Sequence, residues 1–201
     1  MLLINIEFMN SIRTLSLLTV LFFCCMASLA QVKKFDTTFK IEDVGYKVVC
    51  SNKNADQNGV TIKPVEFKNT AREVSFNIRG KVIKGEIGDL NNDGFPDLML
   101  YIFGVPNAAT GTAVCVSSVE NSSLAPILFP DIYDNPKLRD GYKGYDEFSI
   151  KYGVLNRSFP IYKAGDADNK PTGGKRMIQY QVVTENGRPS FKVSRTYDVL
   201  P

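Results

Sequence analysis

The sequence predicts an all-β protein, folded as a single antiparallel β-sandwich (or flattened barrel) of about eight to ten short strands. Apolar and polar residues alternate over short segments, most clearly at Val74-Ser75-Phe76-Asn77-Ile78, and this period of two is typical of half-buried strands. Turn-forming Gly, Asn, Asp and Pro residues separate these segments at close spacing. Beyond the N-terminal segment, no stretch shows the periodicity of an amphipathic helix.

The strands are expected in a simple order along the chain. A weak strand surrounds Phe39, and Val44–Cys50 alternates apolar residues with others. Pro64 restricts its own strand to a sheet edge or a bulge, because proline has no N–H to donate. Leu98–Phe103 is apolar on both faces, which is typical of a central strand. The other segments are 60–67, 74–79, 81–87, 112–118, the apolar 125–132, 148–152, 155–162, and a hairpin of 177–183 and 191–197 turning at Glu185-Asn186-Gly187.

Residues 1–30 are typical of a secretory signal peptide. Arg13 precedes an apolar run from Leu15 to Met26, and Ser28-Leu29-Ala30 fits a cleavage site with small residues. The run is shorter than the ~20 residues that a membrane span needs. We therefore expect cleavage after Ala30, a mature β domain of residues 31–201 without a membrane span, and a location in the periplasm or outside the cell.

Composition and charge argue against two classes of function. The chain has a net charge of +3 at pH 7, and loss of the signal peptide removes one Arg and one Glu and leaves that charge unchanged. No block of basic residues is present, whereas nucleic-acid binding needs a clustered basic face. The chain also has no His, which is the commonest general base of enzymes. We expect a protein without catalytic residues and without a nucleic-acid partner, and we rank an exported hydrolase last.

Two cysteines, Cys50 and Cys115, remain after the signal peptide is removed. Exported proteins seldom leave thiols free, so a disulfide between the two is the favoured prediction. Such a bond would contribute roughly 4 kcal/mol in the chain-entropy model. The alternative is a pair of separate buried thiols, which pack as small apolar side chains.

The segment Gly88–Tyr101 joins a series of oxygen-bearing residues to the most apolar strand of the chain. Calcium takes oxygen ligands from alternate residues of a curled loop, and the corresponding positions here hold Asp89, Asn91, Asp93, Phe95 (through its carbonyl) and Asp97. Gly94 permits the sharp turn between them. Leu100 replaces the last Glu of an EF-hand, so the loop instead resembles the strand-flanked calcium loops of FG-GAP-type repeats. The alternative is a metal-free hairpin turn. Calcium is the one cofactor that the sequence predicts.

Three stretches together resemble the periplasmic inhibitors of invertebrate-type (I-type) lysozyme. They are Gly85–Tyr101 with its acidic loop, Gly141–Phe148 (GYKGYDEF), and Phe159–Tyr180 with Pro-Thr-Gly-Gly-Lys-Arg at its centre. The resemblance covers most of residues 40–198. It implies an exported β-sandwich that inserts a rigid loop into the cleft of a lysozyme, where donors on the loop bind the two catalytic carboxylates.

The inhibitory loop of that family follows the strand after the acidic turn and carries a Ser-Gly-x-Tyr pattern. The matching residues here are Asn107, Ala108, Ala109 and Thr110, so neither the Ser nor the Tyr is present. We expect the loop 105–112 to contact the partner, with Tyr142 and Tyr145 either at its rim or packed as a lid. The alternative function is a calcium-stabilised exported module that binds a glycan or a cell-surface protein.

Overall fold

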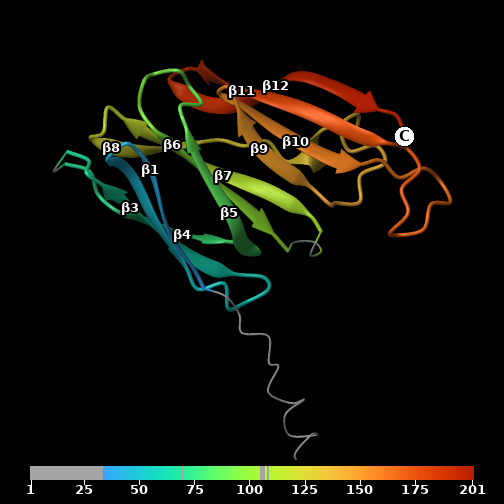
Figure 1. The fold of residues 1–201 in the computed structure, drawn as a ribbon, viewed down its shortest axis with the longest axis horizontal. Coiled ribbons are helices and arrows are strands. Elements are labelled where there is room, and N and C mark those ends of the chain that lie inside the picture. The colour runs from blue at the N-terminus through green and yellow to red at the C-terminus, as the bar shows by residue number, and fades with distance from the viewer. Residues whose placement is uncertain (1–33, 69, 105–106, 108) are drawn as a thin grey trace, which may run out of the picture. The chain divides into compact units, whose positions relative to one another are not determined.

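Strands that follow one another in sequence pair in groups of four, and these groups form three separate antiparallel sheets (Figure 1). The structure is a computed structural model that describes residues 34–68, 70–104, 107 and 109–201. Within these residues there are twelve strands, four in each sheet, and one short 3-10 helix, η1 (Ile132–Asp134). The strands from β1 to β12 belong to one compact unit.

The three sheets follow one another along the chain, and each is built from four consecutive strands. The N-terminal sheet contains β1 (Phe35–Ile41), β2 (Val44–Cys50), β3 (Asn58–Val65) and β4 (Val74–Ile78) in that order. The middle sheet contains β5 (Lys81–Gly88), β6 (Asp97–Phe103), β7 (Gly111–Val119) and β8 (Ser123–Ile127). The C-terminal sheet contains β9 (Glu147–Lys151), β10 (Val154–Pro160), β11 (Lys175–Glu185) and β12 (Arg188–Val199), ordered β12-β11-β10-β9.

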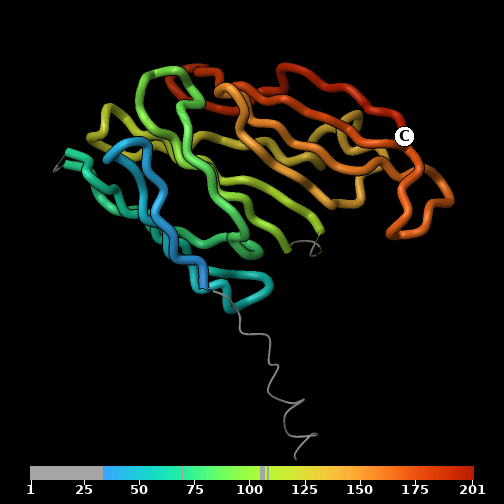
Figure 2. The backbone as a smooth tube through the Cα atoms, in the orientation of Figure 1, coloured from blue at the N-terminus to red at the C-terminus, as the bar shows by residue number. Residues whose placement is uncertain are grey.

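The middle sheet lies between the other two and is covered on both faces (Figure 2). Successive side chains of a strand point to opposite faces. On β6, Leu98 and Leu100 therefore enter one apolar core with the N-terminal sheet. Met99 and Tyr101 enter a second core with the C-terminal sheet. The prediction that this segment is a central strand, apolar on both faces, is confirmed.

The all-β antiparallel prediction is confirmed, with twelve strands among the described residues in place of the expected eight to ten. The first of them, β1, is an edge strand whose side chains are mostly exposed, so its sequence shows little alternation. The apolar segment 125–132 is only partly a strand, because it leaves β8 after Ile127 and enters η1. Pro64 pairs with β2 at a point beyond the end of the pairing with β4. It therefore lies at a local sheet edge, as expected.

The predicted disulfide is wrong, since Cys50 and Cys115 are both free and buried. Cys50 belongs to the core between the N-terminal and middle sheets, where its thiol lies 3.1 Å from Oδ1 of Asn52. Cys115 belongs to the core on the other face of the middle sheet. Burial raises the pKa of the Cys115 thiol. The two cysteines pack as separate apolar side chains because a whole sheet stands between the two cores.

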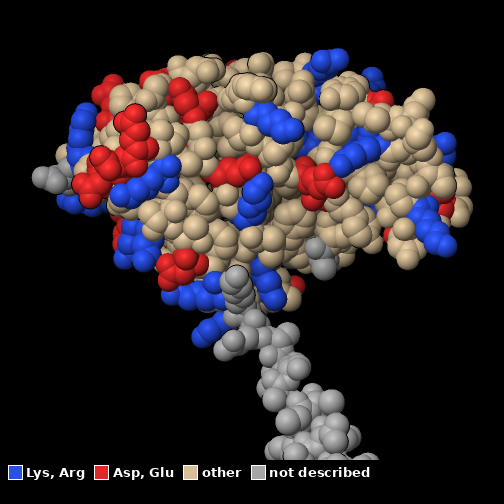
Figure 3. All heavy atoms as spheres, viewed as in Figure 1, with Lys and Arg blue, Asp and Glu red and all other residues tan. Residues whose placement is uncertain are grey.

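The signal peptide predicted at residues 1–30, with its cleavage site at Ala30, lies outside the described residues. The described part of the chain contains no helix both long and apolar enough to cross a membrane. Lys and Arg side chains are interspersed with Asp and Glu over the face displayed in Figure 3.

The double burial of β6 predicts a large difference between two aliphatic truncations. Leu100→Ala should lower the free energy of unfolding by about 2–5 kcal/mol, because Leu100 is fully buried and its loss leaves a cavity. Ile83→Ala is the control, since Ile83 is exposed beside the β-bulge of β5, and it should change stability by less than about 0.5 kcal/mol. Urea unfolding measures both. Equal losses would contradict the burial of Leu100 in the core shared with the N-terminal sheet.

Candidate functional site

The predicted inhibitory loop and the corner at residue 145 lie side by side, although they are distant in sequence. The backbone N–H of Tyr145 donates to the carbonyl of Ala109 over 2.7 Å. Together they line an open hollow of about 480 Å³, whose lining residues are Asn107, Ala109, Lys143, Tyr145 and Asp168. We call these five residues the loop surface. Tertiary structure therefore brings the predicted contacts Asn107, Ala109 and Tyr145 together.

Hydrogen bonds within the loop hold it in one shape. Oδ1 of Asn107 accepts from the N–H groups of Ala109 (2.9 Å) and Thr110 (3.0 Å), which is the local backbone bonding that makes Asn a turn residue. It also accepts from the hydroxyl of Thr110 over 3.2 Å. Thr110 is only 6% exposed, so the free protein offers little of this side chain to a partner. Ala108, another predicted contact, lies outside the described residues.

Tyr145 presents its ring and hydroxyl at the surface. The residue is 48% exposed, and its φ of 62° is uncommon for a bulky side chain. Its ring stacks on Tyr162 with 6.3 Å between centroids. Nζ of Lys143 lies 4.9 Å from the centre of the Tyr162 ring and 3.2 Å from the carboxylate of Asp168. The Tyr145 hydroxyl donates to the carbonyl of Asp168 over 3.4 Å, a long and solvent-exposed hydrogen bond. The loop surface thus combines an aromatic hydroxyl and an ammonium group whose present contacts are both with Asp168.

Gly144 makes the close approach of the corner and the loop possible. A Cβ at this position would lie 2.8 Å from the backbone of Ala109, and the φ of Gly144 is +97°. Any other residue would push Tyr145 away from the loop. The second glycine of the GYKGY sequence, Gly144, is thus required for the corner to pack against the loop.

Tyr142, the other predicted tyrosine, is packed as a lid and does not join the loop surface. Its ring meets Phe159 edge-on at 4.7 Å and Tyr133 at 5.8 Å between centroids. Its hydroxyl donates to Oδ2 of Asp146, and burial raises the pKa of the Tyr142 phenol. The packed alternative that the sequence left open is therefore the one observed.

Beneath the loop surface lies a charged pair that is sealed from solvent. Arg157 of β10 is 1% exposed, and its Nε donates to Oδ1 of Asp146 over 2.7 Å. Oδ2 of Asp146 accepts the N–H of Gly111 (2.7 Å), and Nη2 of Arg157 donates to the carbonyl of Gly111 (3.0 Å). Burial opposes the charge on Arg157, but the Asp146 carboxylate raises the pKa of the guanidinium. The pair fixes the start of β7, where the loop ends.

The sequence analysis did not assign this pair to the site, although the sequence contains an indication of it. Arg157 alternates with Leu155 and Phe159, so it stands on the apolar face of its strand. A charge on such a face must be paired and hydrogen-bonded to be tolerated. Asp146 supplies the counter-charge, since its two carboxylate oxygens accept from Gly111 and Arg157.

The acidic loop connects β5 to β6 at the opposite end of β6 from the loop surface. Asp89 accepts the N–H groups of Asp93 (3.1 Å) and Gly94 (3.0 Å). Oδ1 of Asn91 also accepts from Asp93, and Oδ1 of Asp93 accepts from the N–H of Phe95 over 2.9 Å. The φ of Gly94 is +83°, the left-handed conformation that the turn requires. These bonds fold the loop tightly.

Asp97 is the residue of the acidic loop that local hydrogen bonding leaves unsatisfied. Its side chain is 0% exposed, and Oδ2 accepts the N–H of Leu90 over 2.8 Å. Among the described residues, nothing donates to Oδ1. Burial raises the pKa of Asp97 to about 6. A buried acceptor without a partner costs about 1–3 kcal/mol, and a bound cation would remove that cost.

The donor set fits a hard cation in its chemistry, because it offers three carboxylates and one amide oxygen within nine residues of chain. Within the described residues, no three Asp, Glu, His or Cys side chains already converge as a metal site. Asp89, Asp93 and Asp97 would have to draw together around the ion. Asn91 would join them through Oδ1.

A search of protein-family models, curated proteins and solved structures finds no match to this chain. Evidence for a function therefore comes from the geometry of the site and the chemistry of its residues.

The buried pair predicts a measurable cost when one partner is removed. Arg157→Met should lower the free energy of unfolding by about 3–5 kcal/mol, because it leaves the Asp146 carboxylate buried and uncompensated. The double variant Arg157→Met/Asp146→Asn should recover part of that loss. Arg195→Met is the control, since Arg195 is exposed on β12. Equal melting temperatures for the two single variants would contradict the assigned role of Arg157.

Proposed function

We propose that this chain is an exported, non-enzymatic binding protein that presents the loop surface to the cleft of a partner, a lysozyme of the invertebrate type. The observation that carries this proposal is the position of Tyr145 beside the loop of Asn107 and Ala109. The resembling inhibitors carry an aromatic hydroxyl within the loop itself. In this chain the loop lacks it, and Tyr145 supplies one from the neighbouring corner.

The chemistry of the loop surface suits an acidic cleft. A glycosidase cleft presents two carboxylates that flank the scissile bond, and an ammonium or hydroxyl donor binds such groups through charge-assisted hydrogen bonds. Lys143 and Tyr145 provide these donors. Asp168 pairs with Lys143, but its side chain is almost fully exposed, and surface pairs of this kind contribute little stability. A carboxylate of the partner can therefore replace Asp168 at low cost.

Preorganisation supports the same proposal. The three acceptor contacts of Asn107 close the loop, and the buried Arg157–Asp146 pair anchors its end. A rigid loop loses little conformational entropy when it binds, so more of the contact energy appears as affinity. No catalytic role is needed for any of these residues.

We further propose that the acidic loop binds one calcium ion through Asp89, Asn91, Asp93, the Phe95 carbonyl and Asp97. The unpaired, buried Oδ1 of Asp97 supports this assignment. The ion would supply positive charge to a group of carboxylates that otherwise repel one another. Its role is to stabilise the turn between β5 and β6, and the loop surface lies at the far end of β6.

The binding proposal predicts a specific loss on removal of one oxygen atom. The protein should inhibit cell-wall lysis by an invertebrate-type lysozyme. Tyr145→Phe should weaken that inhibition roughly 10- to 150-fold, because one charge-assisted hydrogen bond is worth about 1.5–3 kcal/mol. Tyr152→Phe is the matched control, since Tyr152 is also exposed with a positive φ and lies outside the loop surface. It should inhibit as the unchanged protein does.

The assay should include lysozymes of other classes as alternative partners. Inhibition confined to another type would reassign the partner and keep the loop surface. Absence of inhibition throughout the panel would reject the lysozyme proposal and favour a calcium-stabilised module that binds a glycan or a cell-surface protein.

The calcium proposal predicts a change in melting temperature with metal. At a calcium concentration 100 times the Kd, binding adds about 2.7 kcal/mol, which corresponds to a rise of roughly 5–10 °C for a domain of this size. Asp97→Asn should abolish most of this rise. Asp131→Asn serves as the control, because Asp131 accepts a backbone N–H in a separate turn. Identical melting in calcium and in chelator would leave only the hairpin-turn interpretation.

A further inference from the structure

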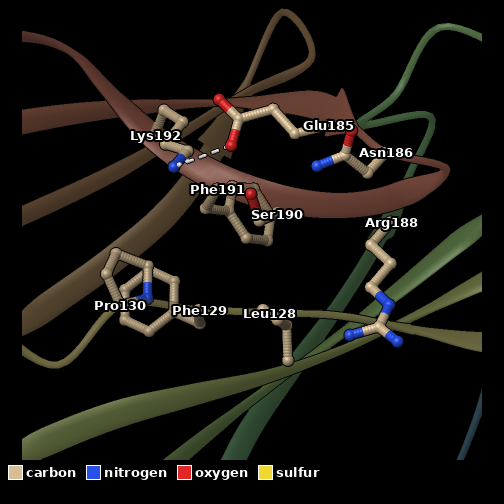
Figure 4. A pocket seen from close by; sticks show the side chains of 9 residues that line it. All are labelled: Leu128, Phe129, Pro130, Glu185, Asn186, Arg188, Ser190, Phe191 and Lys192. Atoms are coloured by element: carbon tan, nitrogen blue, oxygen red, sulfur yellow. Dashed lines mark ion pairs between the residues drawn. The ribbon is translucent and has the colours of Figure 1, made fainter.

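A groove of about 670 Å³ lies beside the edge of β12, distant in sequence from the loop surface (Figure 4). Leu128, in the segment that follows β8, pairs with Ser190 in a single parallel bridge. Its N–H donates to the carbonyl of Pro189 (3.3 Å), and its own carbonyl accepts from Phe191 (2.8 Å). The backbone of Leu128 is thus fixed, yet its side chain is 62% exposed.

The floor of the groove is apolar and firmly supported. Phe129 packs against Phe191 with 5.8 Å between ring centroids and against Tyr180 with 5.1 Å. Figure 4 shows Leu128, Phe129 and Pro130 along one side of the groove, facing the residues of the β11–β12 hairpin. A ligand would therefore meet a preformed apolar surface.

The rim carries one positive charge that the protein does not neutralise. Lys192 and Glu185 form an ion pair at one end, with 3.3 Å between Nζ and Oε2. Arg188 is the register partner of Glu185 across the turn, but its side chain extends away from that ion pair and towards Leu128 (Figure 4). Within the described part of the chain, no carboxylate pairs with Arg188. The groove thus combines an apolar floor with a guanidinium group that is free to bind an anion.

We propose that this groove binds the carboxyl-terminal residue of a peptide whose last side chain is apolar. The side chain would pack on Leu128 and Phe129, and the terminal carboxylate would accept two parallel hydrogen bonds from Arg188. Asn186 also lines the groove, above Arg188 in Figure 4, and its side-chain amide would bond the last peptide group. This amide favours a peptide over a fatty acid, which has no such group. The site does not depend on the proposed lysozyme inhibition.

Titration of the ¹⁵N-labelled protein tests the proposal with three probes: N-acetyl-Ala-Leu as the free acid, the same dipeptide as its amide, and decanoate. The free acid should produce saturable shifts of the backbone resonances of Ser190, Phe191 and Lys192. The amide and decanoate should bind at least tenfold more weakly. Equal affinity for acid and amide would overturn the role of the carboxylate, and tighter binding of decanoate would overturn the peptide assignment.

Two arginine variants locate the anion site. Arg188→Gln should weaken binding of the free acid to the level of the amide probe, without loss of fold because Arg188 is exposed. Arg195→Gln is the matched control on the same strand, where Arg195 lies over the ring of Tyr197 at 4.9 Å, and it should leave the affinity unchanged. Equal affinities for the two variants, or no shifts at all with the free acid, would overturn the proposal.

Discussion

Burial of both faces of β6 is the constraint on which the rest of the structure depends. Leu98 and Leu100 on one face and Met99 and Tyr101 on the other are almost fully buried, and each such side chain contributes about 1.5–3 kcal/mol by leaving water. A strand of this kind needs a sheet on each side, and the two outer sheets meet that need. Its two ends then carry the acidic loop and the loop surface, about 20 Å apart for a strand of seven residues.

The second determinant is the buried charge of Arg157. Such a pair is a weak source of stability compared with apolar packing, because two ions must be taken out of water. Its contribution here is to fix the position of the backbone at Gly111. Arg157 and Asp146 bond the same residue, Gly111, from its carbonyl and its N–H, and so hold the end of the loop against the corner that carries Tyr145. A pair of apolar residues at these two positions would fill the space without fixing either backbone.

The two candidate sites differ in how many of their polar side-chain groups are already hydrogen-bonded within the protein. At the loop surface, Oδ1 of Asn107 is used by the N–H groups of the loop itself. Lys143 and Tyr145 each make one exposed contact with Asp168, over 3.2 Å and 3.4 Å, and a partner can replace both contacts. In the acidic loop nearly every oxygen accepts a local N–H, and the exception is Oδ1 of the buried Asp97. The first pattern is that of a rigid surface for binding, and the second is that of a structural turn that a cation would complete. Both proposed sites therefore lie on loops that the sheets hold in place.

The sequence by itself determined the strands, the all-β class and the central place of β6, because alternation and double-sided apolarity are local properties that a strand keeps in any fold. It could not assign Cys50 and Cys115 to separate cores, nor place Tyr145 beside Ala109, since both depend on which sheets face each other. Those contacts were decided by the burial of the middle sheet and by the glycine at 144, which alone permits the corner to approach the loop. The tertiary structure therefore decided which residues line the proposed binding surface. Asn107 and Ala109 belong to the loop that the family resemblance indicated, whereas Lys143, Tyr145 and Asp168 come from other parts of the chain.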